Sequence, residues 1–447
     1  MKYLAPDFAY TPEGLQTGMV ISIDDDGRIT DILSQEEIDT MPDMANLAAG
    51  QVVALPGVAL LPGFVNTHSH VFQRALRGHT HRPLSPRDTF WTWRQAMYRE
   101  AQRLTPETLY ARAFSVYSEM LAAGYTTVGE FHYVHHQPNG RPYADPNEMS
   151  LAVLDAGRDA GIRVVLLMTA YAQSGFNTPP EPEQRRFCDI SVEAFLSRVE
   201  NLRQSNALIG VAPHSVRAVP ESWFRAIAEY SYTHHIPLHV HADEQVGEIE
   251  QCRAVYGCAP VELLERFGAL GTLTTIVHAT HANANEIALL ARYGCTVCVC
   301  PTTEGDLGDG IAPYAELLAA RIPLAIGSDS NTRLDPIEEL RWAEYTARMR
   351  YQRRRVLVAD EMASPGPLLL QFGAGFGADA LGIPSGSIAP GQLADFVEID
   401  LNHSSLVDWN AGSAGSAGSP DDLLDVMFFG ASAEIIRGTW VGGEKVF

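Results

Sequence analysis

Lysine is almost missing from this chain of 447 residues. Its two lysines, Lys2 and Lys445, lie near the ends, so arginine supplies nearly all of the positive charge. This scarcity argues against a catalytic lysine, whether as a Schiff base, as a phosphate ligand or as a carbamylated bridge between two metal ions. Positive charge is scarce as well, since 54 acidic and 32 basic residues give a formal net charge of -22. We therefore expect neither nucleic acid nor a membrane as a partner.

Long apolar runs and a cysteine framework are also missing. No stretch approaches the uninterrupted apolar length of a membrane span, and the first residues lack the apolar segment of a secretory signal. The six cysteines do not form the pattern of a disulfide framework in a chain of this size. We therefore expect a cytoplasmic protein, and a content of 46% hydrophobic residues is sufficient for a large core.

Short apolar runs alternate with amphipathic helical stretches along the middle of the chain, which predicts an α/β fold with a parallel sheet. Helices are predicted over Thr105–Ala123, Asn147–Ala160 and Asp335–Arg350, because each begins at a capping residue or stops before a glycine. Eight strands are predicted: Leu60–His68, Thr126–Phe131, Arg163–Thr169, Leu208–Pro213, Pro237–His241, Leu273–His278, Thr296–Pro301 and Pro323–Ser328. Eight strand–helix repeats indicate a TIM-like (β/α)8 barrel.

The two ends of the chain have a different pattern of short strands and tight turns. Neither end is long enough to form a stable domain alone. We therefore expect residues 1–62 and 386–447 to form one small β-sandwich domain, and residues 63–385 to form the barrel. Asn410–Pro420 repeats Gly, Ser and Ala, a composition typical of a mobile loop.

Polar residues that can bind a metal follow many of the predicted strands. Because side chains i and i+2 of a strand point to one side, His68 and His70 can reach the same ion. In a barrel the carboxyl ends of the strands meet at one mouth, where chemistry takes place. The residues at these ends are His68, His70, His214, His239, His241, His278 and Asp329. Random placement of 15 histidines would rarely produce such a convergence.

A single zinc ion is expected at this mouth, with imidazole and carboxylate ligands and an open position for water. We assign His68, His70, His241 and Asp329 as its ligands, while His239 has the same parity as His241 and competes for that role. Glu244 follows His241 by three residues and suits a proton shuttle. The predicted catalytic residues are Glu244, His278 and Asp329, acting on water activated by the metal.

These motifs resemble the amidohydrolase superfamily, and in particular its mononuclear deaminase branch. The resemblance covers essentially the whole chain and rests on Leu61-Pro-Gly-Phe-Val-Asn-Thr-His68-Ser-His70, His241-x-x-Glu244, His278, Gly-Ser-Asp329 and Gly391-Gln-Leu-Ala-Asp-Phe. The binuclear branch carries a carbamylated lysine at strand four. Here strand four ends Val-Ala-Pro-His214 and no lysine is near, so a binuclear centre is excluded. Zinc is the metal that the resemblance implies, with iron as the alternative, and a homodimer is the implied assembly.

Within this branch, several segments resemble the formimidoylglutamate deiminases. They are Glu130-Phe-His-Tyr133-Val-His-His136, Gly140–Asp145, Ala212-Pro-His214-Ser-Val-Arg217 and Cys300-Pro-Thr-Thr-Glu304. The implied reaction is deimination of N-formimino-L-glutamate to N-formyl-L-glutamate and ammonia, in histidine catabolism. The substrate is a small dicarboxylate, and the residues that the resemblance assigns to it are Gln73, Arg94, Tyr133, His214 and Arg217.

Two positions depart from the pattern of these deiminases, and two other interpretations of the function stay open. Asp243 and Asp306 stand where other residues are expected, and Asp243 would weaken dianion binding if it faced the pocket. Trp91 and Trp93 are predicted to pack beneath a loop over the mouth. A deaminase of guanine or another purine would share all the metal ligands. A catalytically silent binding protein is the third interpretation, although such proteins typically lose ligands.

Overall fold

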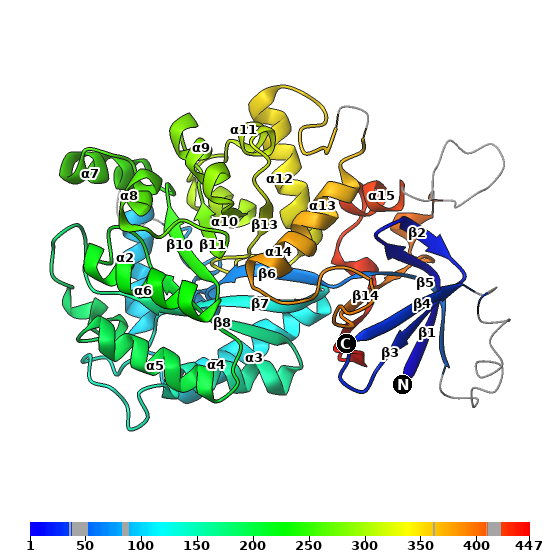
Figure 1. The fold of residues 1–447 in the computed structure, drawn as a ribbon, viewed down its shortest axis with the longest axis horizontal. Coiled ribbons are helices and arrows are strands. Elements are labelled where there is room, and N and C mark those ends of the chain that lie inside the picture. The colour runs from blue at the N-terminus through cyan, green and yellow to red at the C-terminus, as the bar shows by residue number, and fades with distance from the viewer. Residues whose placement is uncertain (35–36, 38–51, 83–88, 361–362, 408, 410–421) are drawn as a thin grey trace.

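A computed structural model describes the chain except for residues 35–36, 38–51, 83–88, 361–362, 408 and 410–421. The described chain contains two eight-stranded sheets, and Figure 1 shows one of them, surrounded by helices, beside the other, which lies near the two termini. The loop predicted over Asn410–Pro420 lies outside the described residues. Within the described residues, no helix is long and apolar enough to span a membrane.

The sheet surrounded by helices consists of eight parallel strands that follow one another in chain order, as predicted. They are β6 (Phe64–Ser69), β7 (Tyr125–His132), β8 (Arg163–Ala170), β9 (Ile209–Pro213), β10 (Leu238–Ala242), β11 (Thr274–His278), β12 (Thr296–Val299) and β13 (Leu324–Ile326). A parallel bridge between Ser69 and Asp329 joins the first strand to the segment after the last. The sheet therefore closes into the predicted TIM-like barrel.

Helices follow the strands and cover the barrel. The three predicted helices are confirmed as α3 (Pro106–Ala122), α4 (Glu148–Ala160) and α12 (Pro336–Tyr351). Thr105 and Asp335 cap the first and the last of these by accepting backbone N–H bonds. The other helices are α2 (Phe90–Ala101), α5 (Val192–Gln204), α6 (Glu221–His234), α7 (Val246–Tyr256), α8 (Pro260–Phe267), α9 (Ala284–Tyr293), α10 (Pro301–Leu307), α11 (Tyr314–Ala319), α13 (Gly366–Gly373) and α14 (Gly375–Ala380).

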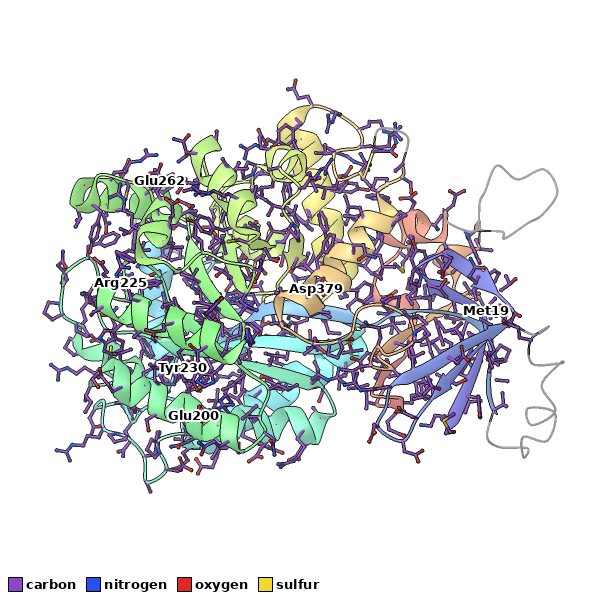
Figure 2. The ribbon with its side chains drawn as sticks, viewed as in Figure 1. Met19, Glu200, Arg225, Tyr230, Glu262 and Asp379 are labelled. Carbon is purple, nitrogen blue, oxygen red and sulfur yellow. The ribbon has the colours of Figure 1, made fainter. Side chains whose placement is uncertain are left out.

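Neighbouring helices of this outer layer are also joined by polar contacts. Tyr230 of α6 donates its hydroxyl to Glu200 of α5 at 2.6 Å, and both side chains are labelled in Figure 2. Arg203 reaches the same carboxylate through two N–H groups at 2.8 and 2.9 Å. Hydrogen bonding to these partners lowers the pKa of Glu200 to about 2, so the carboxylate is charged at neutral pH.

The two ends of the chain together form the second eight-stranded sheet. Its strands are β1 (Lys2–Thr11), β2 (Gly14–Thr17), β3 (Met19–Ile23), β4 (Ile29–Ser34), β5 (Val52–Pro62), β14 (Phe396–Asp400), β15 (Ile436–Val441) and β16 (Glu444–Lys445). The strands of the expected β-sandwich run as one continuous mixed sheet, with a hydrophobic core of its own that includes Ile21, Leu60 and Phe396. The helix α15 (Asp422–Gly430) lies instead against α12 and α13.

The predicted first barrel strand, Leu60–His68, has the wrong start. The chain changes sheets at Gly63: Gly63 N donates to Asp395 O at 3.0 Å, whereas Phe64 N donates to Gly124 O at 3.0 Å. A Cβ on Gly63 would lie 2.3 Å from Cγ2 of Thr126, so only glycine fits this crossing. One apolar run thus serves two sheets, and its hydrophobicity gives no sign of the break. The division of the chain at residues 62 and 386 stays a prediction.

Candidate active site

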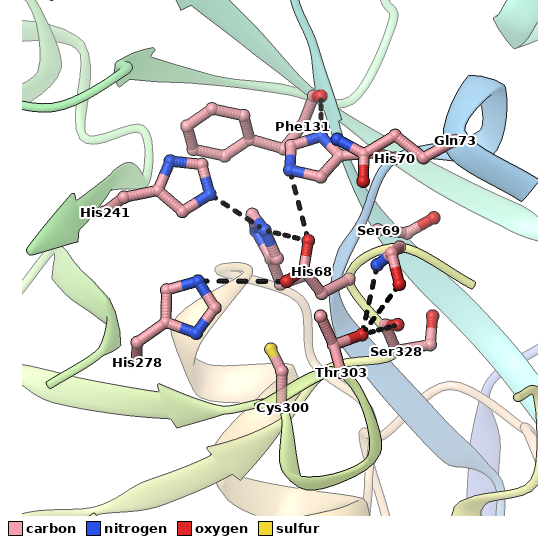
Figure 3. Close-up of polar contacts among 12 residues, drawn as sticks. His68, Ser69, His70, Gln73, Phe131, His241, His278, Cys300, Thr303 and Ser328 are labelled. Atoms are coloured by element: carbon pink, nitrogen blue, oxygen red, sulfur yellow. Dashed lines mark hydrogen bonds and ion pairs between the residues drawn. The ribbon is translucent and has the colours of Figure 1, made fainter. Parts of the chain in front are cut away.

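Three imidazoles and one carboxylate converge at the carboxyl ends of the barrel strands. Nε2 of His68 lies 3.1 Å from Nε2 of His241, and Oδ1 of Asp329 lies 3.5 Å from Nε2 of His68 and 3.4 Å from Nε2 of His70. All four residues are buried. Figure 3 shows the three imidazoles turned toward one another, with His68 on β6, His70 directly after β6 and His241 on β10. The structure brings together the four residues predicted as metal ligands.

Hydrogen bonds on the far side of the rings fix two of these imidazoles. Nδ1 of His70 lies 2.8 Å from the carbonyl oxygen of Phe131, and Nδ1 of His241 lies 3.0 Å from that of His214. Because a carbonyl only accepts, each Nδ1 carries the proton and donates it, which leaves the lone pair of Nε2 directed at the cluster. His239 bonds instead to the carbonyl of Ala380 at 3.1 Å. His239 lies two residues before His241 on β10, farther from the mouth, and it does not belong to the cluster.

The donor set fits a divalent metal ion. Ligand atoms at the usual 2.0–2.1 Å from a tetrahedral zinc ion are about 3.3 Å apart. The three measured separations, from 3.1 to 3.5 Å, lie around this value. Burial lowers the pKa of His68 to about 3 and also lowers the pKa values of His70 and His241, so the imidazoles are neutral and can donate lone pairs. Burial opposes ionisation of Asp329, but the histidines outweigh it and lower its pKa.

The turn that carries Asp329 is held by buried polar side chains. Ser328 N donates to Oδ1 of Asn66 at 3.0 Å, and Thr303 Oγ1 donates to the carbonyl of Ser328 at 3.1 Å. Figure 3 shows Ser328 and Thr303 beside the cluster. Asp329 itself has a φ of +46°, in the left-handed region that non-glycine residues rarely adopt. The surrounding hydrogen bonds hold this backbone so that the carboxylate faces the histidines.

Two further ionisable groups lie beside the cluster, where the sequence predicted catalytic residues. Nε2 of His278 lies 3.9 Å from Oε1 of Glu244 and 3.8 Å from Oδ2 of Asp329. Burial raises the pKa of Glu244 to about 7. Burial alone would lower the pKa of His278, but Glu244, Glu304 and Asp329 raise it above its usual value. These groups can therefore hold and exchange protons near neutral pH.

A cavity of about 530 Å3, which includes its open mouth, leads from the surface to this cluster. Its lining contains the five residues predicted to bind substrate: Gln73, Arg94, Tyr133, His214 and Arg217. Gln73 Nε2 donates to the hydroxyl of Tyr133 at 2.9 Å. His70, His241, Glu244, His278 and Asp329 line the same cavity. The structure thus joins the candidate metal site and the candidate substrate residues in one space.

The two arginines of this cavity have different surroundings. Nε of Arg217 lies 3.5 Å from Oε1 of Glu248, and both side chains are buried. Arg94 has no carboxylate partner within the described part of the chain, and its buried Nη1 has no hydrogen-bond partner there. Its guanidinium lies 4.6 Å from the ring centre of Trp91 and 5.5 Å from that of Tyr98. Arg94 is therefore a cation that is free to pair with an acidic ligand.

Known proteins resemble this chain over most of its length. The model of the amidohydrolase family matches residues 59–446. The chain belongs to the amidohydrolase family. The curated formimidoylglutamate deiminase of Pseudomonas aeruginosa is 38% identical over 100% of this chain and 94% of its own. The 8-oxoguanine deaminase of the same organism is 31% identical over 88% of this chain and 84% of its own. A crystal structure of an amidohydrolase from Brucella melitensis covers 100% of this chain and 94% of its own, with 33% identity and a TM-score of 0.87.

The two residues that depart from the expected pattern do not line the cavity of this amidohydrolase. Asp243 is fully buried behind the strand end, where burial and the neighbouring Glu286 and Glu248 raise its pKa well above the usual value. Asp306 forms an ion pair with the exposed His81 at 3.3 Å. Both carboxylates therefore lie away from the pocket that would receive a dianion.

Sequence reasoning missed three residues around the active site of the amidohydrolase. Glu304 lies 3.3 Å from Nδ1 of His278 and fixes the far side of that ring. Glu248 contacts Arg217. Trp91 was expected only to pack beneath a loop, but its indole lies against the guanidinium of Arg94. Glu304 was part of a recognised motif but had no assigned role. Glu248 and Trp91 lie on helices, where a single acidic or aromatic residue gives no signal of function.

Proposed function

We propose that this amidohydrolase deiminates N-formimino-L-glutamate by hydrolysis to N-formyl-L-glutamate and ammonia. The observation that carries the proposal is the position of Arg94 and Arg217 in the cavity that ends at the histidine cluster. Arginine pairs with carboxylates through two parallel N–H bonds, which suits a dicarboxylate. The 38% identity with a formimidoylglutamate deiminase over the full chain supports the same substrate.

The metal would be held by His68, His70, His241 and Asp329. We propose one zinc ion, with iron as the alternative. A divalent cation bound by these residues would lower the pKa of a water molecule to near neutrality. Asp329 would accept a proton from that water and His278 would hold it by a hydrogen bond, since Nε2 of His278 lies 3.8 Å from Oδ2 of Asp329.

The substrate chain would lie with its carboxylates toward the arginines and its formimino group toward the cluster. Gln73, Tyr133 and His214 line the wall between the two and supply further polar contacts. The oxygen of water adds to the formimino carbon, and Glu244 gives a proton to the imino nitrogen. A second proton, released by the water as it adds, passes to the same nitrogen; the bond from carbon to that nitrogen then breaks, with its electron pair on nitrogen, and ammonia leaves. A proton lost from oxygen returns to the acidic groups, and the formyl C=O forms.

Purine deamination is the rival reaction, because its chemistry uses the same cluster. It has no use for two arginines placed to bind carboxylates, and the relative with an 8-oxoguanine substrate has the lower identity, 31%. A silent binding protein is disfavoured because the ligand and proton-transfer residues are all present and correctly gathered. We further propose a homodimer in the cytoplasm.

The test is ammonia release by the purified, zinc-loaded protein from N-formimino-L-glutamate, guanine, 8-oxoguanine and adenosine. The proposal predicts turnover of the first compound and at most trace activity on the purines. Faster turnover of any purine, or no activity on N-formimino-L-glutamate, would contradict it. Zinc content after dialysis addresses the silent interpretation, which requires that no metal be tightly held.

A further inference from the structure

One aromatic ring faces both arginines of the cavity. The guanidinium carbon of Arg94 lies 4.6 Å from the ring centre of Trp91, and that of Arg217 lies 5.7 Å from the same ring. Both distances are within the range at which a cation is attracted to the face of an indole. The arginines come from different elements, since Arg94 belongs to α2 and Arg217 follows β9. Trp91 therefore links two cations that the fold supplies separately.

Trp91 does not itself line the cavity, unlike its neighbours Phe90 and Trp93. Its indole lies at the start of α7, where a Cβ on Gly247 would be 3.6 Å from Cζ2 of the ring. Trp91 is thus in contact with the helix turn that carries Glu248. A residue in this position can influence a bound ligand only through the side chains that lie between them.

Glu248 approaches Arg217 on the edge away from the terminal N–H groups. Oε1 of Glu248 lies 3.5 Å from Nε of Arg217, and Glu248 is only 2% exposed. Glu248 does not line the cavity, whereas Arg217 does. With the Nε edge facing Glu248, the terminal N–H groups of Arg217 remain for a ligand.

We propose that Trp91 and Glu248 are positioning residues that hold Arg94 and Arg217 ready for the two carboxylates of the substrate. The inference rests on the proposed function, because it assumes a dicarboxylate in this cavity. Two guanidinium groups that point into one cavity repel each other and would turn away without fixed partners. The ring of Trp91 and the carboxylate of Glu248 attract the two guanidinium groups and hold them in place. The entropy of ordering these side chains is therefore lost before the ligand binds and does not weaken binding.

The first test compares Trp91→Leu with Trp91→Phe, using ammonia release from N-formimino-L-glutamate. Loss of both ring contacts is expected to raise KM about ten- to thirtyfold while kcat stays within about threefold. Trp91→Phe keeps an aromatic face, so its KM is expected to stay within about threefold of the unmodified protein. Formamidine, which has the reacting group but no carboxylate, is the internal control. Its kcat/KM is expected to be the same in all three proteins, which general damage to the fold would not allow.

The second test separates orientation by Glu248 from its charge. Glu248→Ala removes the contact with Nε and is expected to raise KM about tenfold. Glu248→Gln keeps a polar oxygen in the position of Oε1, 3.5 Å from Nε, so its KM is expected to stay within about threefold. Formamidine turnover is again expected to be unchanged in both variants.

The outcomes separate the inference from the proposed function. An unmodified protein that does not deiminate N-formimino-L-glutamate would overturn both. Normal turnover with an unchanged KM in Trp91→Leu and Glu248→Ala would overturn the inference alone. The inference also fails if formamidine and N-formimino-L-glutamate lose activity in parallel, because the residues would then act on the fold and not on the arginines. If Trp91→Leu does not fold, Glu248→Ala and Glu248→Gln decide in the same way.

Discussion

Replacement of Arg217 by methionine tests whether the cavity binds a carboxylate. Arg217→Met keeps a flexible apolar stem but removes the guanidinium that lines the cavity. A charge-assisted hydrogen bond contributes about 1.5–3 kcal/mol, so loss of a two-bond pair costs about 3–4 kcal/mol after relaxation. Each 1.36 kcal/mol is about a factor of ten, so kcat/KM for N-formimino-L-glutamate should fall by about a hundred- to a thousandfold, chiefly through KM.

Steady-state ammonia release measures this loss, and zinc content shows whether the metal site survives. Zinc should be retained, because Arg217 is not among the clustered ligand atoms of His68, His70 and His241. Arg225→Met is the matched control: Arg225 lies on α6 with a half-exposed side chain and pairs with Glu221 at 2.7 Å (Figure 2). Its kinetics should be unchanged. Unaltered kinetics in Arg217→Met would refute the reasoning, since no carboxylate could then depend on this residue.

Three further results are expected. Removal of metal by a chelator should abolish activity and lower the Tm, because His68, His70, His241 and Asp329 lose their common partner. Added zinc should restore both the activity and the Tm. Activity that survives with no bound metal would contradict the proposed metal site. Asp395→Ala should lower the free energy of unfolding by about 3–5 kcal/mol, as measured by denaturant titration. The variant removes the ion pair that joins the two sheets and leaves the partly buried Arg163 without its carboxylate partner. The kcat of the folded protein should not change. Burial raises the pKa of Glu339 from 4.5 to about 8, so the folded state favours the protonated carboxyl. The contribution of Glu339 to the free energy of unfolding is therefore fully present below about pH 4.5 and is lost as the pH rises through about 8. Glu339→Gln, which can still accept from Thr302, should flatten the fall in Tm over this range, and an unchanged pH profile would argue against the shift.

The barrel and the metal cluster could be predicted because their signals are local in the sequence. His68 and His70 lie at i and i+2 at the end of one strand, and the rule that strand ends meet at one mouth brings His241 and Asp329 to them. The start of the first barrel strand could not be predicted, because the run up to Pro62 pairs with β14 and only the fold shows where the hydrogen bonds change sheets.

The support around the arginines could not be predicted for a different reason. Glu248 and Trp91 act through contacts between α7, α2 and the loop after β9, which are set by tertiary packing. A glutamate in the first turn of a helix is also expected on electrostatic grounds alone, so its position carries no functional signal. The direction of Asp243, by contrast, could be predicted, because it falls between His241 and Glu244 and is therefore expected to point away from the cavity, whose lining does not include it.

The most direct test of the central claim is the identity of the product formed from N-formimino-L-glutamate in water enriched in 18O. The account predicts one ammonia for each N-formyl-L-glutamate, with a single 18O in the formyl group, as read by mass spectrometry. Formation of L-glutamate and formamide would show that the other C–N bond breaks. That result, or a formyl group without the heavy isotope, would contradict hydrolytic deimination at this site.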